Sequence, residues 1–267
     1  MRSIYFPIST LLATMCLLFL SIDNHPNYKL IFAGNRDEFY NRETAAAQFW
    51  HANDNILGGR DLVAGGTWLA MTRQGRIGMV TNYRDPQNIM SNAPSRGHLV
   101  SDFLAGDESP DTYLRHVSGN GKMYNGFNLI VGDKNDLWYY SNYREGVEKL
   151  APGFYGLSNH LLETAWPKVV RGKERIKPVI EGAVIDPEKV LDALYDDHVA
   201  EDKLLPATGL PLTQERALSS MFIKMEEYGS RCSTVILIDK ADQVLFTERV
   251  YNTSTFDHTT SSFRFSM

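Results

Sequence analysis

The chain of 267 residues has only two cysteines, Cys16 and Cys232. They form no Cys-x-x-Cys pair and no Cys-x-x-Cys-His motif, which excludes a zinc knuckle, a covalently attached haem and a small secreted fold held by disulfides. No residue pattern marks a metal site. Two isolated thiols are typical of a reducing compartment, so we expect a cytoplasmic protein, associated with an organelle if the source is eukaryotic.

The sequence also lacks an excess of positive charge. Its 27 Lys and Arg residues face 32 Asp and Glu residues, giving a formal net charge of −5 at pH 7. Neither the basic nor the acidic residues form a continuous run in the sequence. Because proteins that bind nucleic acid need a basic patch to contact phosphates, nucleic acid is excluded as a partner.

A long apolar run is missing as well. The stretch 4–20 is interrupted by Pro7, Ser9 and Thr10, and it falls short of the roughly 20 apolar residues of a membrane-spanning helix. No Ala-x-Ala cleavage site follows it, as a secretory signal would require. We expect no stable membrane insertion. We interpret residues 1–14 as an N-terminal extension or a misassigned start, with Met15 as the natural first residue.

The remaining composition is that of an ordinary globular protein. Apolar residues make up 43% of the chain and charged residues 22%, so the chain can bury a core without metal or disulfides. No shift in composition, repeat or low-complexity tract divides it. We expect a single domain over residues 15–267.

Strand patterns come in pairs separated by short turn-forming segments. The pairs are 16–22 with 29–34, 67–72 with 76–81, 127–132 with 137–142, and 234–239 with 244–250. Adjacent hairpins predict antiparallel sheet. Several strands are apolar at consecutive positions, which indicates sheets covered on both faces.

Helices are expected between the hairpins, at 97–105, 109–117, 164–179 and 186–194. Asp186 can cap the last of these, and Pro187 suits its first position. The segment 203–212 is expected to be an exposed loop. This order favours an α+β fold of two packed antiparallel sheets flanked by helices, and argues against a parallel nucleotide-binding sheet.

Cys16 stands at the head of an apolar strand. If Cys16 were the first residue of the mature chain, its α-amino group could activate the thiol as a nucleophile. The alternative is that Cys16 is a small apolar residue in a core strand, as most free cysteines are.

The second candidate is the polar run Asn35-Arg36-Asp37-Glu38, which follows the apolar strand 29–34. An arginine beside two carboxylates can bind an anionic group or hold a neighbouring side chain by paired hydrogen bonds. The alternative is a solvated turn with local ion pairs.

Further polar residues and glycines stand at predicted strand ends. Gly58-Gly59 and Gly65-Gly66 indicate sharp turns or close approach to a ligand. Side-chain amides at such positions can stabilise an oxyanion. The stretches concerned are 81–84, 124–128, 156–159 and 229–233.

Taken together, these motifs resemble the Asn-Arg-Asp-Glu (NRDE) family, the transport and Golgi organisation proteins and their bacterial relatives. The resemblance runs from about residue 15 to the carboxyl terminus. It is carried by Met15-Cys16, Gly34-Asn35-Arg36-Asp37-Glu38-Phe39, Gly65-Gly66-Thr67-Trp68, Thr81-Asn82-Tyr83, Tyr124-Asn125-Gly126-Phe127-Asn128, Tyr155-Gly156-Leu157-Ser158-Asn159, Thr164-Ala165-Trp166-Pro167-Lys168 and Phe246-Thr247-Glu248-Arg249.

The resemblance implies a four-layer αββα sandwich of the N-terminal nucleophile (Ntn) hydrolase type, with a distant likeness to bile-salt hydrolases and penicillin V acylases. By order and local context, Cys16 matches their nucleophile, and Arg36 and Asp37 match the pair that positions its amine and thiol. Asn82 and Asn159 match the oxyanion and amine contacts. Arg231 matches a late arginine of the site.

Three functions remain open. Family likeness favours intracellular haem trafficking or lipid (acyl-CoA) handling, in which the pocket binds a large amphipathic anion. The alternative is an N-terminal cysteine amidohydrolase that cleaves linear amides with Cys16. The third and weakest is an interaction or secretion factor without small-molecule chemistry, which leaves these motifs unexplained.

For the binding function we expect an arginine-rich pocket with an aromatic wall. No cofactor is required, but haem can be bound cargo. None of the seven histidines lies in an axial-ligand pattern, and Cys16 could supply a thiolate ligand to haem. The oligomeric state is left open. The expected ligand-binding residues are Asn35, Arg36, Asp37, Glu38, Arg60, Trp68, Tyr83 and Arg84.

Overall fold

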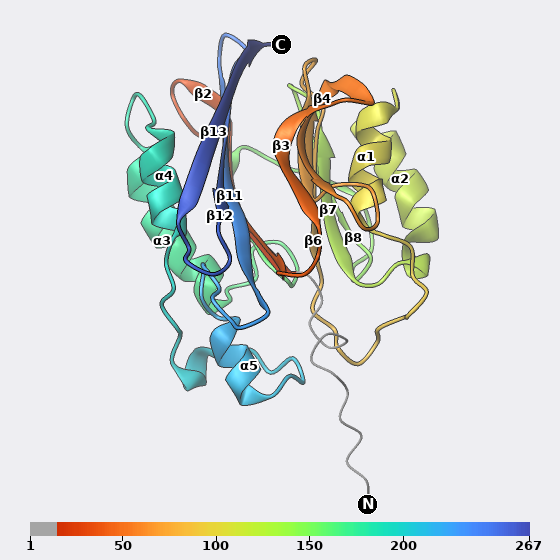
Figure 1. The fold of residues 1–267 in the computed structure, drawn as a ribbon. Helices are drawn as coiled ribbons and strands as arrows, with labels where there is room; N and C mark the ends of the chain where they lie inside the picture. Colours follow the sequence, from red (N-terminus) through yellow and green to blue (C-terminus); the bar gives the residue numbers. More distant parts are fainter. Residues whose placement is uncertain (1–14) are drawn as a thin grey trace, which may run out of the picture.

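The computed structural model describes residues 15–267, so the expected extension 1–14 lies outside the described residues. The strands form two antiparallel sheets (Figure 1). The first sheet has the order β10 (Gly153–Leu157), β1 (Met15–Ile22), β2 (Tyr28–Phe39), β11 (Tyr228–Asp239), β12 (Gln243–Tyr251) and β13 (His258–Ser266). The second has the order β3 (Thr44–Trp50), β4 (Asn53–Asp61), β5 (Leu69–Thr72), β6 (Ile77–Asn82), β7 (Phe127–Gly132), β8 (Leu137–Ser141) and β9 (Glu148–Lys149).

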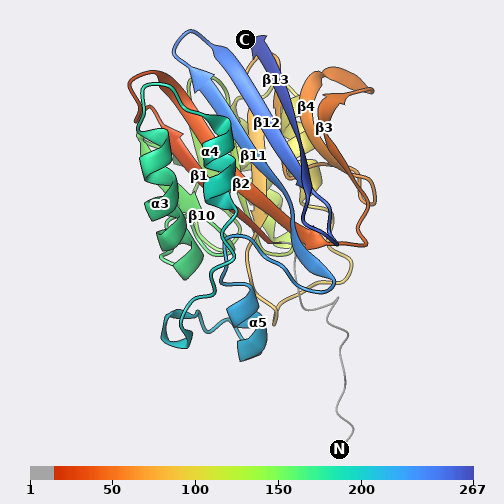
Figure 2. The same cartoon turned by 60° about the vertical axis from the view of Figure 1, so that its left-hand side comes forward.

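The helices cover the outer faces of the two sheets. Helices α3 (Pro167–Ile180) and α4 (Pro187–Leu194) pack on the first sheet, and α1 (Gly97–Ala105) and α2 (Pro110–Asn120) pack on the second (Figures 1 and 2). A short α5 (Leu212–Ala217) and two 3₁₀ turns, Gly121–Met123 and Asp202–Leu204, complete the elements. The αββα layering expected from the sequence is confirmed.

Strand β1, which lies between β10 and β2, shows why both faces of the first sheet are buried. Side chains alternate along a strand, so Leu17 and Phe19 pack against the helices, whereas Leu18 and Leu20 pack against the second sheet. All four are at most 1% exposed. An uninterrupted apolar run is therefore what this position requires.

The four predicted hairpins are all present, and the four predicted helices form within a few residues of their expected bounds. The Asp186 side chain accepts a hydrogen bond from the Glu188 amide and Pro187 occupies the first turn of α4, as expected. Helix α3 begins three residues later than predicted, at Pro167. The residue before it, Trp166, is extended (φ −67°, ψ 149°), the conformation that a following proline favours.

Several elements were not predicted. Strands β3, β4, β9, β10 and β13 are additional, and the expected loop 203–212 contains part of a 3₁₀ turn and the first residue of α5. Gly58 lies inside β4, where a Cβ atom would come within 2.5 Å of the Ala70 Cβ, so close strand packing explains this glycine without a turn. Gly65 and Gly66 do make the expected sharp turn, with φ of +88° and +26°.

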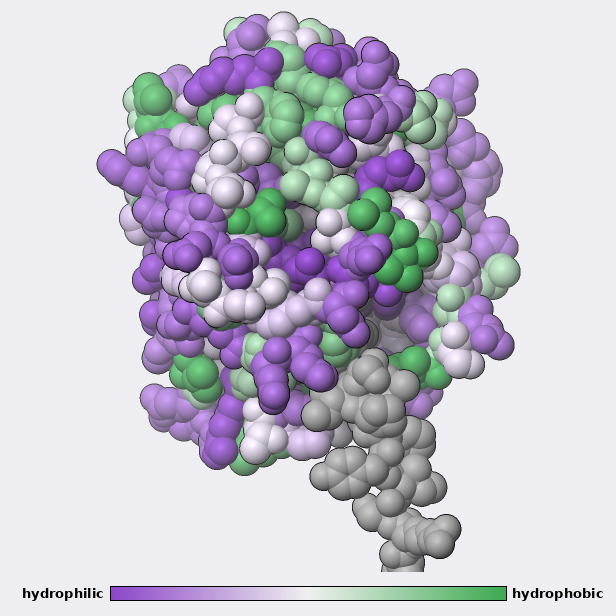
Figure 3. All heavy atoms as spheres, viewed as in Figure 1, coloured by the Kyte–Doolittle hydropathy of each residue, from purple (hydrophilic) through white to green (hydrophobic). Residues whose placement is uncertain are grey.

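The surface seen in Figure 3 is mostly hydrophilic. Hydrophobic surface gathers between β13 and β3, where the core between the sheets reaches the outside, and a hollow near the middle of this face has hydrophilic surface inside it. Over the part of the chain that the structure describes, no helix is long and apolar enough to span a membrane.

Candidate functional site

The site is built on one row of residues across three neighbouring strands. Cys16 of β1 pairs with Arg36 of β2, and Arg36 pairs with Cys232 of β11. Residues paired across antiparallel strands point to the same face of a sheet. All three side chains line one cavity between the two sheets.

The cavity has a volume of about 440 Å³, within the usual range of small-molecule sites. Its charged lining is unbalanced, with five arginines against three acidic residues. The arginines are Arg36, Arg42, Arg60, Arg96 and Arg231, and the acidic residues are Glu38, Asp61 and Glu248. An apolar part of the wall is formed by Ala45, Ala46, Ala64, Trp68, Val80 and Val250.

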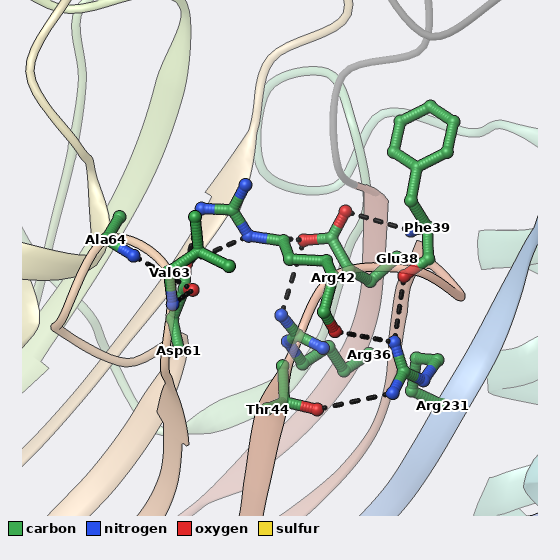
Figure 4. A network of polar contacts seen from close by, with 9 residues as sticks. All are labelled: Arg36, Glu38, Phe39, Arg42, Thr44, Asp61, Val63, Ala64 and Arg231. Atoms are coloured by element: carbon green, nitrogen blue, oxygen red, sulfur yellow. Dashed lines mark hydrogen bonds and ion pairs between the residues drawn. The ribbon is translucent and has the colours of Figure 1, made fainter.

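A β-bulge places Arg231 in this lining. Ser230 pairs with Asp37 and Cys232 pairs with Arg36, so Arg231 is an extra residue in β11. Its guanidinium donates to the carbonyl oxygens of Phe39 (2.8 Å) and Arg42 (3.0 Å) (Figure 4). Arg231 therefore fixes the turn between β2 and β3 and presents positive charge beside the cavity.

Two of the three acidic residues, Asp61 and Glu38, are bound to arginines of the same lining. Arg42 donates to Asp61 at 2.6 Å, and Arg36 donates to Glu38 at 3.3 Å (Figure 4). Glu38 also lies 3.6 Å from the Arg42 guanidinium. These pairs hold the guanidinium groups in place, and the lining keeps a net positive charge.

Arg60 and Arg96 add to this charge from the second sheet and the start of α1. The Arg60 guanidinium lies 4.9 Å from the centre of the Trp50 ring. Arg96 donates to the Gly126 carbonyl at 3.0 Å, and burial lowers the pKa of its guanidinium to about 10. A buried cation of this kind is stabilised by an anion that enters the cavity.

The Cys16 thiol is 2% exposed and is not activated in this arrangement. Burial, followed by the negative charge of Asp37, raises the pKa of the thiol to about 12, although the Arg36 guanidinium opposes the shift. The thiol is therefore protonated at neutral pH, and protonated thiols are poor nucleophiles.

Asp37 and Asn159 lie next to Cys16 but outside the cavity lining. Burial raises the pKa of the Asp37 carboxyl, whose Oδ1 accepts from Ser230 Oγ at 2.6 Å. Asn159 donates to the carbonyl oxygen of Asn82 at 3.1 Å, and Asn82 lines the cavity. The structure thus brings together in one region Cys16, Arg36, Asp37, Asn82, Asn159 and Arg231.

Of the expected ligand-binding residues, Arg36, Glu38, Arg60 and Trp68 line the cavity. Three others have different contacts. Asn35 points to the opposite face of the sheet and donates to the carbonyl oxygens of Leu194 and Met221. Tyr83 stacks on Tyr143, and Arg84 forms a buried ion pair with Glu215 at 2.6 Å. The structure gives these three residues roles in holding the fold.

Sequence reasoning missed four charged residues of this region: Arg42, Arg96, Glu248 and Lys168. Glu248 accepts from the Ala47 amide at 2.6 Å and so joins β12 to β3. Glu248 and Lys168 belong to motifs that carried the family resemblance, so the resemblance was the one signal in the sequence that could have identified these two residues. Within residues 15–267, no group of three His, Cys, Asp or Glu side chains is placed to hold a metal ion.

The fold and site define an α+β sandwich in which a buried cysteine, the second residue of β1, lies beside an arginine-lined cavity. The family model described as Transport and Golgi organisation 2 matches residues 15–253. The chain belongs to this family, which confirms the resemblance seen in the sequence.

Relatives cover most of the chain. A Transport and Golgi organization protein 2 homolog from Bos taurus is 40% identical over 259 residues, covering 88% of this chain and 92% of the relative. Transport and Golgi organization protein 2 from Drosophila melanogaster is 29% identical over 263 residues, covering 88% and 91%.

Among solved structures, the N-acylethanolamine-hydrolyzing acid amidase ortholog of Caenorhabditis elegans has a TM-score of 0.48 and 12% identity, and covers 83% of this chain and 92% of that chain. A variant of conjugated bile acid hydrolase from Clostridium perfringens has a TM-score of 0.39 and 10% identity, and covers 96% and 92%. No conclusion about chemistry follows from likeness at this level.

Proposed function

We propose that this chain binds an amphipathic organic anion of the haem or acyl-CoA class in the cavity between its two sheets. The observation that carries this proposal is the lining of the 440 Å³ cavity, with five arginines against three acidic residues and an apolar wall beside them. Guanidinium groups bind carboxylates and phosphates through paired, charge-assisted hydrogen bonds. The apolar wall offers contact to a macrocycle or an acyl chain.

Binding without cleavage agrees with the state of Cys16. Burial keeps its thiol protonated at neutral pH, with a pKa of about 12, which suits a wall residue better than a nucleophile. The chain would then act in intracellular haem trafficking or acyl-CoA handling and would need no cofactor of its own. The free thiols of Cys16 and Cys232 support a reducing, cytoplasmic setting.

The proposal is tested by titrating the purified chain with haemin, followed by absorbance, and with palmitoyl-CoA, followed by calorimetry. Arg36→Gln removes one charge-assisted contact, so affinity should fall about ten- to hundredfold. Arg115→Gln is the matched control, because Arg115 lies on α2 with its side chain 63% exposed. Equal affinity in Arg36→Gln would remove Arg36 from the site, and failure of the native chain to bind either compound would reject the proposal.

Hydrolysis of linear amides is a second candidate, favoured by one observation. Cys16 and Asn82 line the same cavity, so a nucleophile and an oxyanion donor would face one substrate. The reaction needs Cys16 as the first residue, so that its α-amine can accept the thiol proton.

Amino-terminal sequencing and intact mass of the protein from its native source test this second candidate. A chain that begins at Cys16, with amide turnover that Cys16→Ala abolishes, would support hydrolysis. A chain that retains residues 1–14 would exclude catalysis by the α-amine.

A further inference from the structure

Strand β13 is an edge strand that the proposed binding site does not use. It ends the order of the first sheet, so among the described residues β12 is the one strand that pairs with it. Figure 2 shows β13 at one side of this sheet, away from α3 and α4. The pairing with β12 runs over all nine residues without a shift in register, which leaves a regular row of backbone N–H and C=O groups along the other edge of β13. Such a row is a template for a further strand.

The other three sheet edges carry features that hinder pairing with another chain. Strand β3 has two shifts in its register with β4. Strand β9 consists of Glu148 and Lys149, each held in an ion pair, and β10 is five residues long with α3 packed against it. Strand β13 is nine residues long, contains no proline or lysine, and has Arg264 as its one permanently charged side chain. Its edge is therefore unprotected.

Apolar surface lies beside this edge. Phe263 and Phe265 of β13 face the second sheet, and their ring centres lie 6.0 Å and 5.9 Å from that of Phe49 in β3. All three side chains are only partly buried. Figure 3 shows the hydrophobic surface that gathers between β13 and β3. A contiguous apolar strip on the surface marks an interaction site, and here it runs along an unprotected strand edge.

The sequence of β13 is suited to pairing with a second copy of itself. In the antiparallel register that pairs all nine residues, Ser262 lies opposite Ser262 of the second copy. Arg264 then lies opposite Thr260, so no two like charges meet. Phe263 lies opposite Ser261 and diagonal to Phe263 of the second copy, a separation that aromatic side chains can bridge.

We propose that β13 is the interface of a homodimer, in which the β13 strands of two copies pair antiparallel about a two-fold axis at Ser262. The two six-stranded sheets then form one continuous sheet. A second copy is the occupant that these observations favour, because a two-fold interface uses the same surface on both chains and the charges and rings of β13 fit that arrangement. The dimer goes beyond the proposed function and does not depend on it, since no residue of β13 lines the cavity.

The test is sedimentation velocity of the native chain at concentrations from about 1 to about 100 µM, because mass action raises the fraction of dimer with concentration. Ser262→Lys sets two positive charges opposite each other at the two-fold axis and should weaken self-association roughly three- to tenfold. Ser262→Glu should weaken it to a similar extent. An equimolar mixture of the two variants should associate as the native chain does, because opposite charges then meet.

Ser118→Lys is the matched control, because Ser118 is exposed on α2, which packs on the second sheet. Both Ser262 variants lose the contact of the Ser262 hydroxyl with Thr247 Oγ1 (3.0 Å), so recovery in their mixture isolates the effect of charge. Circular dichroism checks that each variant is folded.

A native chain that stays monomeric throughout this range would overturn the proposal without any variant, and would leave the edge to a strand of another protein. Folded Ser262→Lys that dimerises as well as the native chain would place the interface elsewhere and overturn it too. The same conclusion would follow if the two variants were monomeric and their mixture failed to associate.

Discussion

Cys16 and Arg36 face each other across the pairing of β1 with β2, and both side chains line the cavity between the sheets. The Arg36 guanidinium favours negative charge beside it, but burial outweighs this and keeps the Cys16 thiol protonated. The same guanidinium can instead meet the negative charge of a ligand. This row of residues is therefore better suited to binding an anionic ligand than to forming a thiolate at Cys16.

The buried ion pair between Arg84 and Glu215 is expected to stabilise the fold without contacting the ligand. Both side chains are at most 6% exposed and they lie 2.6 Å apart. Glu215→Gln takes the carboxylate from a buried guanidinium and should lower the free energy of unfolding by about 3–5 kcal/mol, measured by urea denaturation. Ligand affinity of the folded variant should be unchanged. Weaker binding with unchanged stability would instead restore Arg84 to the ligand site.

Asp37 and Lys168 should behave as one energetic unit. Lys168 is buried, and the negative charge of Asp37 is the largest influence that favours its ammonium form. Asp37→Asn removes that charge, and we expect a loss of about 3–5 kcal/mol in unfolding free energy. The double variant Asp37→Asn, Lys168→Met should lose less than the sum of the single losses, by about 0.5–3 kcal/mol. Urea denaturation of all four chains measures this coupling.

The matched control for that cycle is the exposed pair of Lys173 and Glu163, which lie 2.6 Å apart. Its coupling should be no more than about 1 kcal/mol, because solvent screens an exposed pair. Additive losses for Asp37 and Lys168 would show that the two charges do not interact.

Glu248 should make stability depend on pH. Burial raises the pKa of its carboxyl above the ordinary value of 4.5, so the folded chain holds this proton more tightly than the unfolded chain. Its contribution is fully present below pH 4.5 and is lost as the pH rises through the folded-state pKa.

Glu248→Gln cannot lose that proton. The stability of the native chain relative to this variant should therefore fall as the pH rises above 4.5, measured by denaturant unfolding at several pH values. The exposed Glu145→Gln serves as the control. A difference that stays constant with pH would contradict a raised pKa at Glu248.

Much of this fold could be predicted because its signals are local. Each predicted hairpin had two apolar runs and a turn segment between them, and the consecutive apolar residues of β1 indicated a strand buried on both faces. Strands β3 and β13 were missed because their segments, Thr44–Trp50 and His258–Ser266, are rich in alanine or polar residues. They become strands by pairing with β4 and β12.

The site was predicted only in part, for a similar reason. Cys16 and Arg36 were found because each stands in a marked motif. Side chains alternate along a strand, so Asn35 and Asp37 lie on the face of the sheet opposite to Arg36 and Glu38. In the sequence these four residues form one continuous polar run, which does not show that they face two sides. Arg42 and Arg96 reach the cavity from a turn and from the start of α1, and only the packing of the two sheets brings them together.

Protection of the Cys16 thiol by ligand tests most directly whether this cavity is the binding site. Alkylation of Cys16 by iodoacetamide should slow at least about tenfold when palmitoyl-CoA or haemin is present at a concentration well above its dissociation constant, because a bound ligand excludes the reagent. Cys232, which lines the same cavity, should be protected in parallel. Saturating ligand that leaves both alkylation rates unchanged would place the bound anion elsewhere and contradict binding in this cavity.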